Sequence, residues 1–373
     1  MIRRASQDSC CRARGSIAAF WLSAAGAGWV LAGYPLALLA LPRRPWKLGS
    51  ELPSVTFLIP TYREYDLLPE KLRSLAELDY PADRLHVVVV SDGEPDLAEL
   101  ARRCMPEATV LLNEERQGKP TALNRALAQA SGDVIVLSDA HAQLEPAALR
   151  AAVRHFADPS VWGVTGRWSQ LQGAYYRYED VLRRLETRSG STAGVFGGFI
   201  AVRRTRMREF PVDVINDDLW ILCRLVGDGG RVIYEPETRW KELPLATHQE
   251  VERRARIGAG RALLIGELPG LPWSFRWRLA SHKFGRLLLP FFLLGVFVSS
   301  IRLGRRRGYR ELALAQIAAY GLGVASAAGA PVPAGLRRPA GVAGPFVAGN
   351  WGVAVGLIRA LRGRQSVRWK PVR

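Results

Sequence analysis

Two adjacent carboxylates, Asp217 and Asp218, are the residues of this sequence best suited to proton transfer. Neighbouring like charges disfavour ionisation, so we expect the pair to raise the pKa of one member toward that of a general base. The same segment is typical of a helix start, where Asn216 would cap the helix and the two acids would complement its dipole. Both interpretations can hold together.

A second candidate group, Asp139 and His141, closes a strongly apolar run. In an extended segment, side chains two residues apart project to the same side, and this spacing suits the capture of a metal ion. A carboxylate with an imidazole favours Mn²⁺ over Mg²⁺, because Mg²⁺ prefers oxygen ligands. A purely structural histidine is the alternative interpretation.

Polar residues also follow three other apolar runs. Thr61 and Glu64 come after the first run, Asp92 ends the second, and the pair Gly118-Lys119 follows the third. Asp92 is suited to accept hydrogen bonds from a ligand, although a strand-end Asp-Gly is also a turn signal. These residue types suit one polar, anionic ligand.

The apolar runs themselves predict the elements that would position these side chains. Residues 55–59, 85–90, 109–113 and 133–139 alternate with helix-period segments, which is the spacing of βαβ units. Continuous Val, Ile and Leu predict strands buried on both faces, hence an α/β fold with a mainly parallel sheet covered by helices. Ligands of such sheets bind at the carboxyl ends of the strands, where the polar residues are found.

Length and charge restrict the class of protein. The chain has 373 residues, 52 Lys and Arg against 34 Asp and Glu, a net charge of +18, and 48% hydrophobic residues. This is enough for roughly two to three domains, and too apolar for a disordered basic tail. The arginines cluster beside apolar segments rather than among exposed aromatic residues. We therefore expect a membrane protein, with no nucleic acid as a functional partner.

The N-terminal region predicts a membrane anchor. Residues 1–15 form a basic tail, and residues 16–41 contain no charged side chain. This stretch exceeds the ~20 residues that cross a hydrocarbon core. A cleaved signal peptide is the alternative, but the apolar stretch is long for one. Basic residues flank both ends, so the positive-inside rule gives no orientation.

The C-terminal region predicts further membrane segments. Residues 269–286 mix Trp and Phe with Arg and Lys, a composition typical of an interfacial amphipathic helix. Residues 287–361 contain apolar stretches for two or three crossings, and the sequence leaves the number open because the first stretch is short. Residues 362–373 form a second basic tail.

A set of motifs in the central region resembles a known family. They are VTFLIPTYRE, VVVVSDGEPD, GKPTALNRAL, GDVIVLSDAHAQLEPAAL, GGFIAVRR and NDDLWILCRL, in this order. The sequence is similar to the inverting family-two glycosyltransferases of the GT-A fold, in the membrane-integrated branch that includes cellulose, hyaluronan and poly-N-acetylglucosamine synthases. The resemblance covers residues 53–260 and implies a GT-A catalytic domain there, flanked by transmembrane helices.

The resemblance implies roles for the residues that match the family's motifs. Those implied to bind the donor, at its nucleoside, diphosphate or metal, are Thr61, Glu64, Asp92, Lys119, Asp139 and Arg256. Asp139 matches the first carboxylate of the Asp-x-Asp metal motif, and His141 stands where the second Asp is usual. The implied cofactor is a divalent metal, Mn²⁺ or Mg²⁺, held by Asp139 and His141.

Asp218 matches the catalytic base and Asp217 its acidic neighbour, while Gly197 and Gly198 would let the backbone approach the acceptor. Arg256 occupies the family's Gln-x-x-Arg-Trp segment, but the Gln and the Trp are missing here. Their loss removes the aromatic platform that accompanies processive polymer synthesis.

The implied function is transfer of a sugar, with inversion, from a nucleotide-diphosphate sugar to a lipid-linked or polysaccharide acceptor. A UDP-sugar is the expected donor. Because nucleotide sugars are cytosolic, we expect a multi-pass protein of the plasma or inner membrane with its catalytic domain on the cytoplasmic side. Two alternatives stay open: a processive synthase subunit that works with a partner protein, and a catalytically silent scaffold in polysaccharide assembly.

Overall fold

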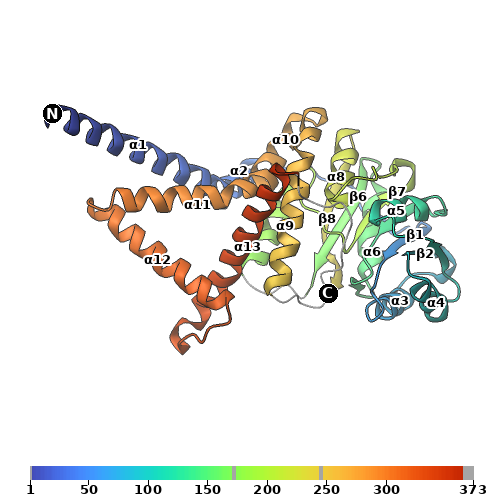
Figure 1. Cartoon of the computed structure of the whole chain (residues 1–373). Coiled ribbons are helices and arrows are strands. Elements are labelled where there is room, and N and C mark those ends of the chain that lie inside the picture. The colour runs from blue at the N-terminus through green and yellow to red at the C-terminus, as the bar shows by residue number, and fades with distance from the viewer. Residues whose placement is uncertain (1, 170–173, 243–246, 364–373) are drawn as a thin grey trace.

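The computed structural model describes residues 2–169, 174–242 and 247–363. Figure 1 shows an α/β domain built around a sheet and a group of helices that extends from one side of it. The chain begins in that group with α1 (Ile2–Gly28), a π-helical turn (Trp29–Gly33) and α2 (Tyr34–Ala40). The predicted basic tail at 362–373 lies outside the described residues from position 364 onward.

The sheet has eight strands in the order β3-β2-β1-β4-β7-β6-β8-β5. Their bounds are β1 (Val55–Thr61), β2 (Leu85–Asp92), β3 (Thr109–Asn113), β4 (Val134–Leu137), β5 (Gln143–Leu144), β6 (Val161–Trp168), β7 (Ile200–Arg203) and β8 (Arg231–Lys241). The apolar runs read from the sequence form β1 to β4, as predicted.

The pairing of the strands is mixed. β3, β2, β1 and β4 are parallel, with Val55 opposite both Leu85 and Val134. β7 then pairs antiparallel with β4 and with β6, and β8 runs parallel to β6 but antiparallel to β5. The predicted parallel arrangement thus describes the first four strands. β2 and β4 lie on opposite sides of β1 in the sheet. Because the connections after the strands then run in opposite directions, this topology leaves a crevice for a ligand at the carboxyl ends of the strands.

Helices cover both faces of the sheet. One face carries α3 (Leu68–Ala76), α4 (Pro95–Cys104) and α6 (Ala148–Val153), and the other carries α5 (Lys119–Leu127) and α8 (Asp217–Gly227). Phe57 and Ile59 of β1 pack into the first core, whereas Leu58 between them packs into the second. Since alternate residues of a strand point to opposite faces, both sets must be apolar, which explains the continuous apolar runs.

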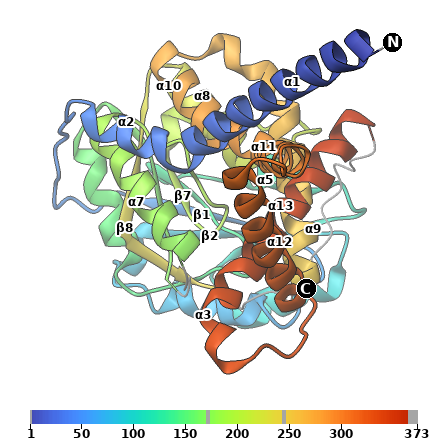
Figure 2. The same ribbon diagram turned by 90° about the vertical axis from the view of Figure 1, so that its left-hand side faces the viewer.

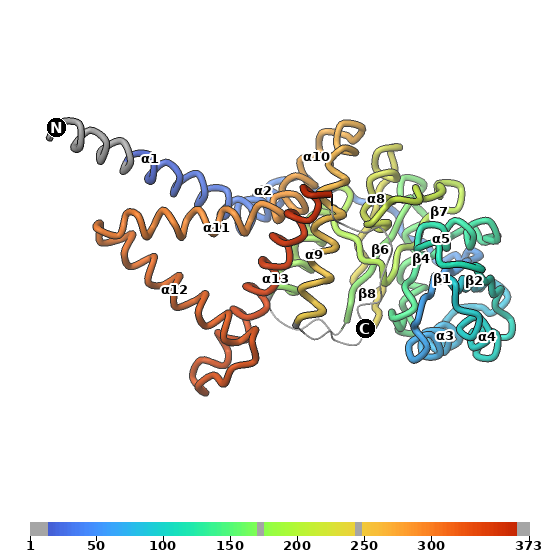
Figure 3. The backbone as a smooth tube through the Cα atoms, viewed as in Figure 1, coloured from blue at the N-terminus to red at the C-terminus, as the bar shows by residue number. Residues whose placement is uncertain are grey.

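After β8 the chain returns to the helical group. It forms α9 (Thr247–Leu263), a 3₁₀ segment (Leu264–Gly270), α10 (Trp273–Leu279), a π-helical turn (Ala280–Phe284), α11 (Gly285–Arg302), α12 (Arg307–Ala327) and α13 (Arg337–Leu361). α1 lies along α11 (Figures 1 and 2), and α9 lies between the sheet and α13 (Figure 3). A Cβ at Gly352 would come within 2.7 Å of the Val251 carbonyl oxygen, so the backbones of α13 and α9 are in close contact there.

Three helical stretches of the described chain are long and apolar enough to cross a membrane, namely Arg14–Ala40, Trp273–Arg302 and Ala334–Leu361. The first coincides with the predicted anchor at 16–41. In the second, the predicted amphipathic segment at 269–286 continues directly into the short apolar stretch that follows it. Two of these three stretches lie in the C-terminal region.

A buried carboxylate joins the helical group to the sheet domain. Glu186, on α7 (Ala174–Ser189), accepts a hydrogen bond from the Tyr34 hydroxyl at 2.7 Å and from the Ala193 backbone N–H at 2.8 Å, and its Oε1 lies 2.7 Å from His282 Nδ1. Burial acts to raise the pKa of Glu186, but His282, Tyr34 and Ala193 together lower it to about 2. Glu186 is therefore an ionised carboxylate that holds α2 and the π-helical turn at Ala280–Phe284 in place.

Replacing Tyr34 by Phe should lower the free energy of unfolding by about 1–3 kcal/mol, because the buried Glu186 carboxylate loses a donor. The matched control is Tyr65→Phe, since the Tyr65 hydroxyl donates to Glu94 at 2.9 Å on the surface. This control should cost less than about 0.5 kcal/mol. Denaturant unfolding of both variants in one detergent measures the difference, and equal losses would contradict the anchoring role.

Candidate active site

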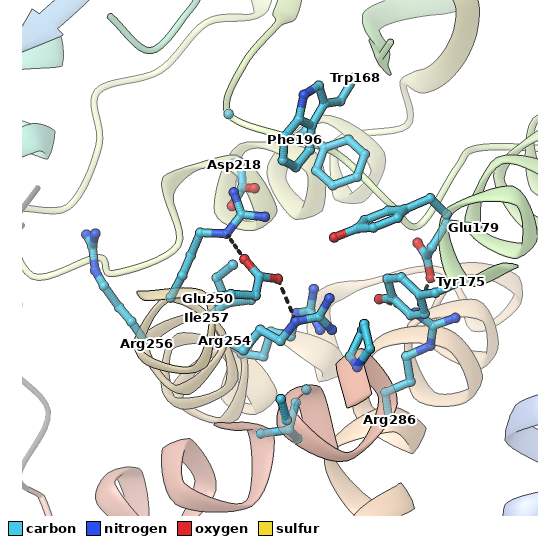
Figure 4. Close-up of a pocket in the computed structure, with 18 of the residues that line it drawn as sticks. Trp168, Tyr175, Glu179, Phe196, Asp218, Glu250, Arg254, Arg256, Ile257 and Arg286 are labelled. Carbon is cyan, nitrogen blue, oxygen red and sulfur yellow. Dashed lines mark hydrogen bonds and ion pairs between the residues drawn. The ribbon is translucent and has the colours of Figure 1, made fainter. Parts of the chain in front are cut away.

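A cavity of about 1260 Å³ lies where the sheet domain meets α7, α9 and α13. Its wall includes most of the residues that the sequence singled out, from both the donor and the acceptor side: Glu64, Lys119, Asp139, His141, Gly197, Gly198, Asp217, Asp218 and Arg256. Figure 4 shows Asp218 near Trp168 and Phe196, with Tyr175, Glu179 and Arg286 on another part of the wall. Residues more than 150 positions apart in sequence thus share one cavity.

Lys119 holds two of the carboxylates together. Its Nζ lies 2.8 Å from Asp139 Oδ1 and 2.9 Å from Asp217 Oδ2. Burial acts to lower the pKa of Lys119, but the two aspartates raise it well above its usual value. Burial likewise acts to raise the pKa of Asp139, but Lys119, His141 and Lys71 hold it below its usual value. Lys119 and Asp139 are therefore both ionised at neutral pH.

Asp218 is the carboxylate that this bridge leaves out. It lies in the first turn of α8, where its Oδ1 accepts a hydrogen bond from the Leu219 backbone N–H at 2.7 Å. Burial first, and then the charge of Asp217, raise the pKa of Asp218 to about 6, against the opposing charges of Lys119 and Arg261. The sequence predicted the effect of the neighbouring acid, and the structure adds burial as the larger cause.

Asn216 occupies the N-cap position of α8, as predicted, but its side chain makes no capping hydrogen bond. Instead, its Nδ2 donates to the Ile257 carbonyl oxygen of α9 at 3.2 Å. Gly260 provides the room, since a Cβ there would come within 2.7 Å of Asn216 Oδ1. The residue therefore fixes α8 against α9 and so places Asp217 and Asp218 opposite Arg256.

Thr61 and Asp92 are both buried and do not line this cavity. The Asp92 carboxylate accepts hydrogen bonds from Asn113 Nδ2 at 2.9 Å and from the backbone N–H groups of Gln117 and Gly118 at 2.9 and 2.8 Å. Gly118 has a φ of +100°, which favours glycine. Asp92 therefore orients the turn that positions Lys119.

His141 is surrounded by carboxylates. Its Nδ1 lies 3.4 Å from Glu64 Oε1, and its Nε2 lies 3.6 Å from Glu242 Oε1 and 3.8 Å from Asp139 Oδ2. Burial acts to lower the pKa of His141, but these three acids raise it. Across the described ranges, no group of three or more His, Cys, Asp or Glu side chains is arranged to hold a metal by itself.

The two glycines of the predicted acceptor side allow close packing in the cavity wall. A Cβ at Gly197 would lie 2.6 Å from Asp139 Oδ2, and one at Gly198 would overlap the Trp240 ring. The Gly198 carbonyl oxygen accepts a hydrogen bond from Ser138 Oγ at 2.6 Å. Both glycines thus let β7 approach the strand end that carries Asp139.

Arg256 is a half-buried cation facing the aspartates. Its Nε is buried without a hydrogen-bond partner within the described part of the chain. Burial lowers the pKa of Arg256, against the opposing charges of Asp217, Asp139 and Asp218. An arginine in this environment is suited to bind an anionic group that enters the cavity.

Two features of the site were not predicted from the sequence. Lys71 of α3 is fully buried and donates to Ser138 Oγ and the Ala142 carbonyl oxygen, both at 2.6 Å. Burial lowers its pKa to about 7, and its contacts brace the turn around Asp139. The second feature is the set of charged residues on α7. The spacing of four residues between Glu179 and Arg183, which allows an ion pair on one face of a helix, is the sequence pattern that could have indicated it.

Comparison with known proteins identifies the domain. Residues 56–210 match glycosyl transferase family 2. The chain carries a family 2 glycosyltransferase domain. Among solved structures, the mannosyltransferase PcManGT from Pyrobaculum calidifontis, in complex with GDP-Man and Mn²⁺, matches with a TM-score of 0.76 and 26% identity, over 94% of this chain and 99% of that chain. The resemblance and the α/β fold of GT-A type predicted from the sequence are confirmed.

Two curated proteins are similar to about half of this chain. The poly-beta-1,6-N-acetyl-D-glucosamine synthase of Staphylococcus aureus is 26% identical over 214 residues, which cover 53% of this chain and 52% of the synthase. The beta-monoglucosyldiacylglycerol synthase of Synechocystis is 27% identical over 192 residues, which cover 46% of this chain and 40% of that enzyme. The matched segments cover 52% and 40% of these two relatives, which is about half of their length or less.

The Lys119 bridge makes a prediction about pH. Lys119→Met removes a charge that lowers the pKa of Asp218, so the pH at half-maximal nucleotide-sugar turnover should rise by about 1 unit. Lys47→Met, at an exposed site, is the matched control and should leave the midpoint in place. The measurement is the pH profile of kcat/KM, and an unchanged or lower midpoint in the Lys119 variant would contradict the electrostatic link.

Proposed function

We propose that this protein is a membrane-bound glycosyltransferase that moves a sugar, with inversion, from a nucleotide-diphosphate sugar to a lipid-linked or polysaccharide acceptor. The observation that supports this most is the environment of Asp218, whose pKa is raised to about 6 on the wall of a cavity shared with Lys119 and Arg256. A carboxylate of this pKa is ionised at neutral pH and still basic enough to accept a proton in the transition state.

In the proposed reaction, Asp218 accepts the proton of the acceptor hydroxyl while the hydroxyl oxygen attacks the anomeric carbon. The bond from that carbon to the donor diphosphate breaks on the opposite side, and the diphosphate leaves with the electron pair. Lys119 and Arg256 supply positive charge for this leaving group. Asp217 keeps Lys119 in place and raises the pKa of the base beside it.

We assign the nucleoside side of the donor to Thr61, Glu64 and Asp92, of which Glu64 reaches the cavity wall. The motif resemblance favours a UDP-sugar, whereas the PcManGT complex holds GDP-Man, so donor binding is best compared across both bases. We assign the acceptor side to Gly197 and Gly198, which shape the wall beside Asp139.

Asp139 and His141 fit a divalent metal that takes its other ligands from the donor phosphates and water. The pair offers one carboxylate and one imidazole, and binding would release the proton that the surrounding acids favour on His141. A metal bound there would neutralise charge on the leaving diphosphate. The Mn²⁺ in the PcManGT complex supports this proposal.

We propose that the three apolar helical stretches anchor the protein in the cell membrane, with the catalytic domain on the cytoplasmic side where nucleotide sugars are found. The second candidate function is that of a processive synthase subunit that works with a partner protein. It is supported by the similarity to the poly-beta-1,6-N-acetyl-D-glucosamine synthase of Staphylococcus aureus. Analysis of product length separates single-sugar transfer from polymer synthesis. For a silent scaffold we expect no donor binding in a folded sample.

Asp218→Asn should lower kcat for sugar transfer by roughly 10²–10⁴-fold, because the acceptor hydroxyl loses its base. The affinity for the nucleotide sugar should change little, since the proposed donor contacts are made by other residues, among them Glu64, Lys119 and Arg256. Asp213→Asn, at an exposed position shortly before α8, is the matched control. Full transfer activity in a folded Asp218 variant would exclude it as the base.

Removal of divalent metal with a chelator should abolish donor turnover, and Mn²⁺ should restore it at lower concentration than Mg²⁺ because of the imidazole ligand. Electron paramagnetic resonance of added Mn²⁺, with and without the nucleoside diphosphate, gives a readout that does not depend on turnover. Asp139→Asn should weaken the bound Mn²⁺ signal. An unchanged signal in that variant would contradict the assigned ligand.

A further inference from the structure

The cavity extends beyond Asp218 toward the apolar helices. On that side its wall includes Leu31 of the π-helical turn, Leu289 of α11, and Val342 and Phe346 of α13. All of these belong to the stretches long and apolar enough to cross a membrane. The region next to the proposed base is therefore continuous with the part of the protein suited to contact lipid chains.

This end of the cavity holds an excess of positive charge. Four basic side chains line it, Arg183, Arg261, Lys283 and Arg286, and Glu179 is the carboxylate among them. Arg183 pairs with Glu179 at 3.1 Å, and Arg286 pairs with the same carboxylate. One acid thus pairs with two arginines, whereas Arg261 and Lys283 form no ion pair with any described residue.

Lys283 is one of two members of the group that form no ion pair within the described ranges, the other being Arg261. The exposed fraction of Lys283 is 4%, yet it makes no hydrogen bond or ion pair to any residue in the described ranges. The charged groups that act on it are Arg261, Glu179, Arg183 and Arg286, three of which are cations. Burying an ammonium group without a partner is costly, so this arrangement is suited to an anion that enters from the cavity.

Arg261 links the basic group to the proposed base. It lies on α9 and, like Lys283, makes no hydrogen bond or ion pair in the described chain. Its charge acts on both Asp218 and Lys283. Arg256, which faces the donor-side aspartates, lies on the same helix five residues earlier. An anion held by Lys283 and Arg261 would therefore lie on the acceptor side of Asp218.

We propose that Lys283 and Arg261 bind the phosphate group of a lipid-linked acceptor. This rests on the proposed glycosyltransferase function and names the anionic lipid as its acceptor class. The basic group would hold the phosphate, and the lipid chain would lie against Leu289, Val342 and Phe346. The hydroxyl to be glycosylated would belong to a sugar carried on that phosphate and would face Asp218. A lipid source is favoured over a free anion because the basic group is continuous with this apolar wall.

The test is equilibrium binding of a tritiated polyprenyl phosphate to the full chain in detergent, with unlabelled polyprenol and inorganic phosphate as competitors. We expect the polyprenyl phosphate to bind at least tenfold more tightly than either competitor. Lys283→Met should lower this affinity by about tenfold or more, whereas Lys283→Arg, which retains the charge, should keep most of it. Lys47→Met serves as the exposed control.

Equal competition by polyprenol, or unchanged affinity in Lys283→Met, would overturn the phosphate site. Competition by inorganic phosphate as strong as that by the lipid would overturn the lipid assignment. Nucleotide-sugar binding by the same wild-type sample keeps the two proposals apart. Donor binding without preference for the lipid phosphate contradicts the acceptor site alone, whereas lipid binding without any donor binding contradicts the glycosyltransferase function.

Discussion

The ion bridge from Lys119 to Asp139 and Asp217 is the interaction on which the site depends. Without that cation, the carboxylates at the end of β4 and at the start of α8 would face one another in a buried cavity, where unpaired charges are strongly disfavoured. One side chain at the start of α5 therefore joins three elements, and its charge holds the pKa of Asp139 below its usual value. The remaining acid, Asp218, is left to burial and to the charge of its neighbour, and its pKa rises to about 6.

The position of Lys119 is itself determined by buried polar contacts. Asp92 accepts two hydrogen bonds from the turn before α5 and one from Asn113 at the end of β3. Lys71 braces the turn after β4. Asn216 fixes α8 against α9. The result is a rigid arrangement in which the donor-side cations and the proposed base face one cavity, consistent with the need for preorganised charge in group transfer.

Much of the fold could be predicted from the sequence because β1 to β4 are buried on both faces and therefore read as continuous apolar runs. The strand-end residues of the site were predictable for the same reason. The short strand β7 could not be recognised as antiparallel, because four residues carry too little periodicity. The hydrogen bond from Asn216 to Ile257 and the shared Glu179 carboxylate could not be predicted either, since they depend on how α8 and α7 pack against helices distant in sequence.

The central claim is that Asp218 activates an acceptor hydroxyl for direct displacement of the donor diphosphate. A single displacement inverts the configuration at the anomeric carbon. The decisive measurement is proton NMR of the product formed in the first turnovers from an α-linked nucleotide sugar. A single displacement with Asp218 as the base gives a β-linked product, and an α-linked product would contradict this mechanism.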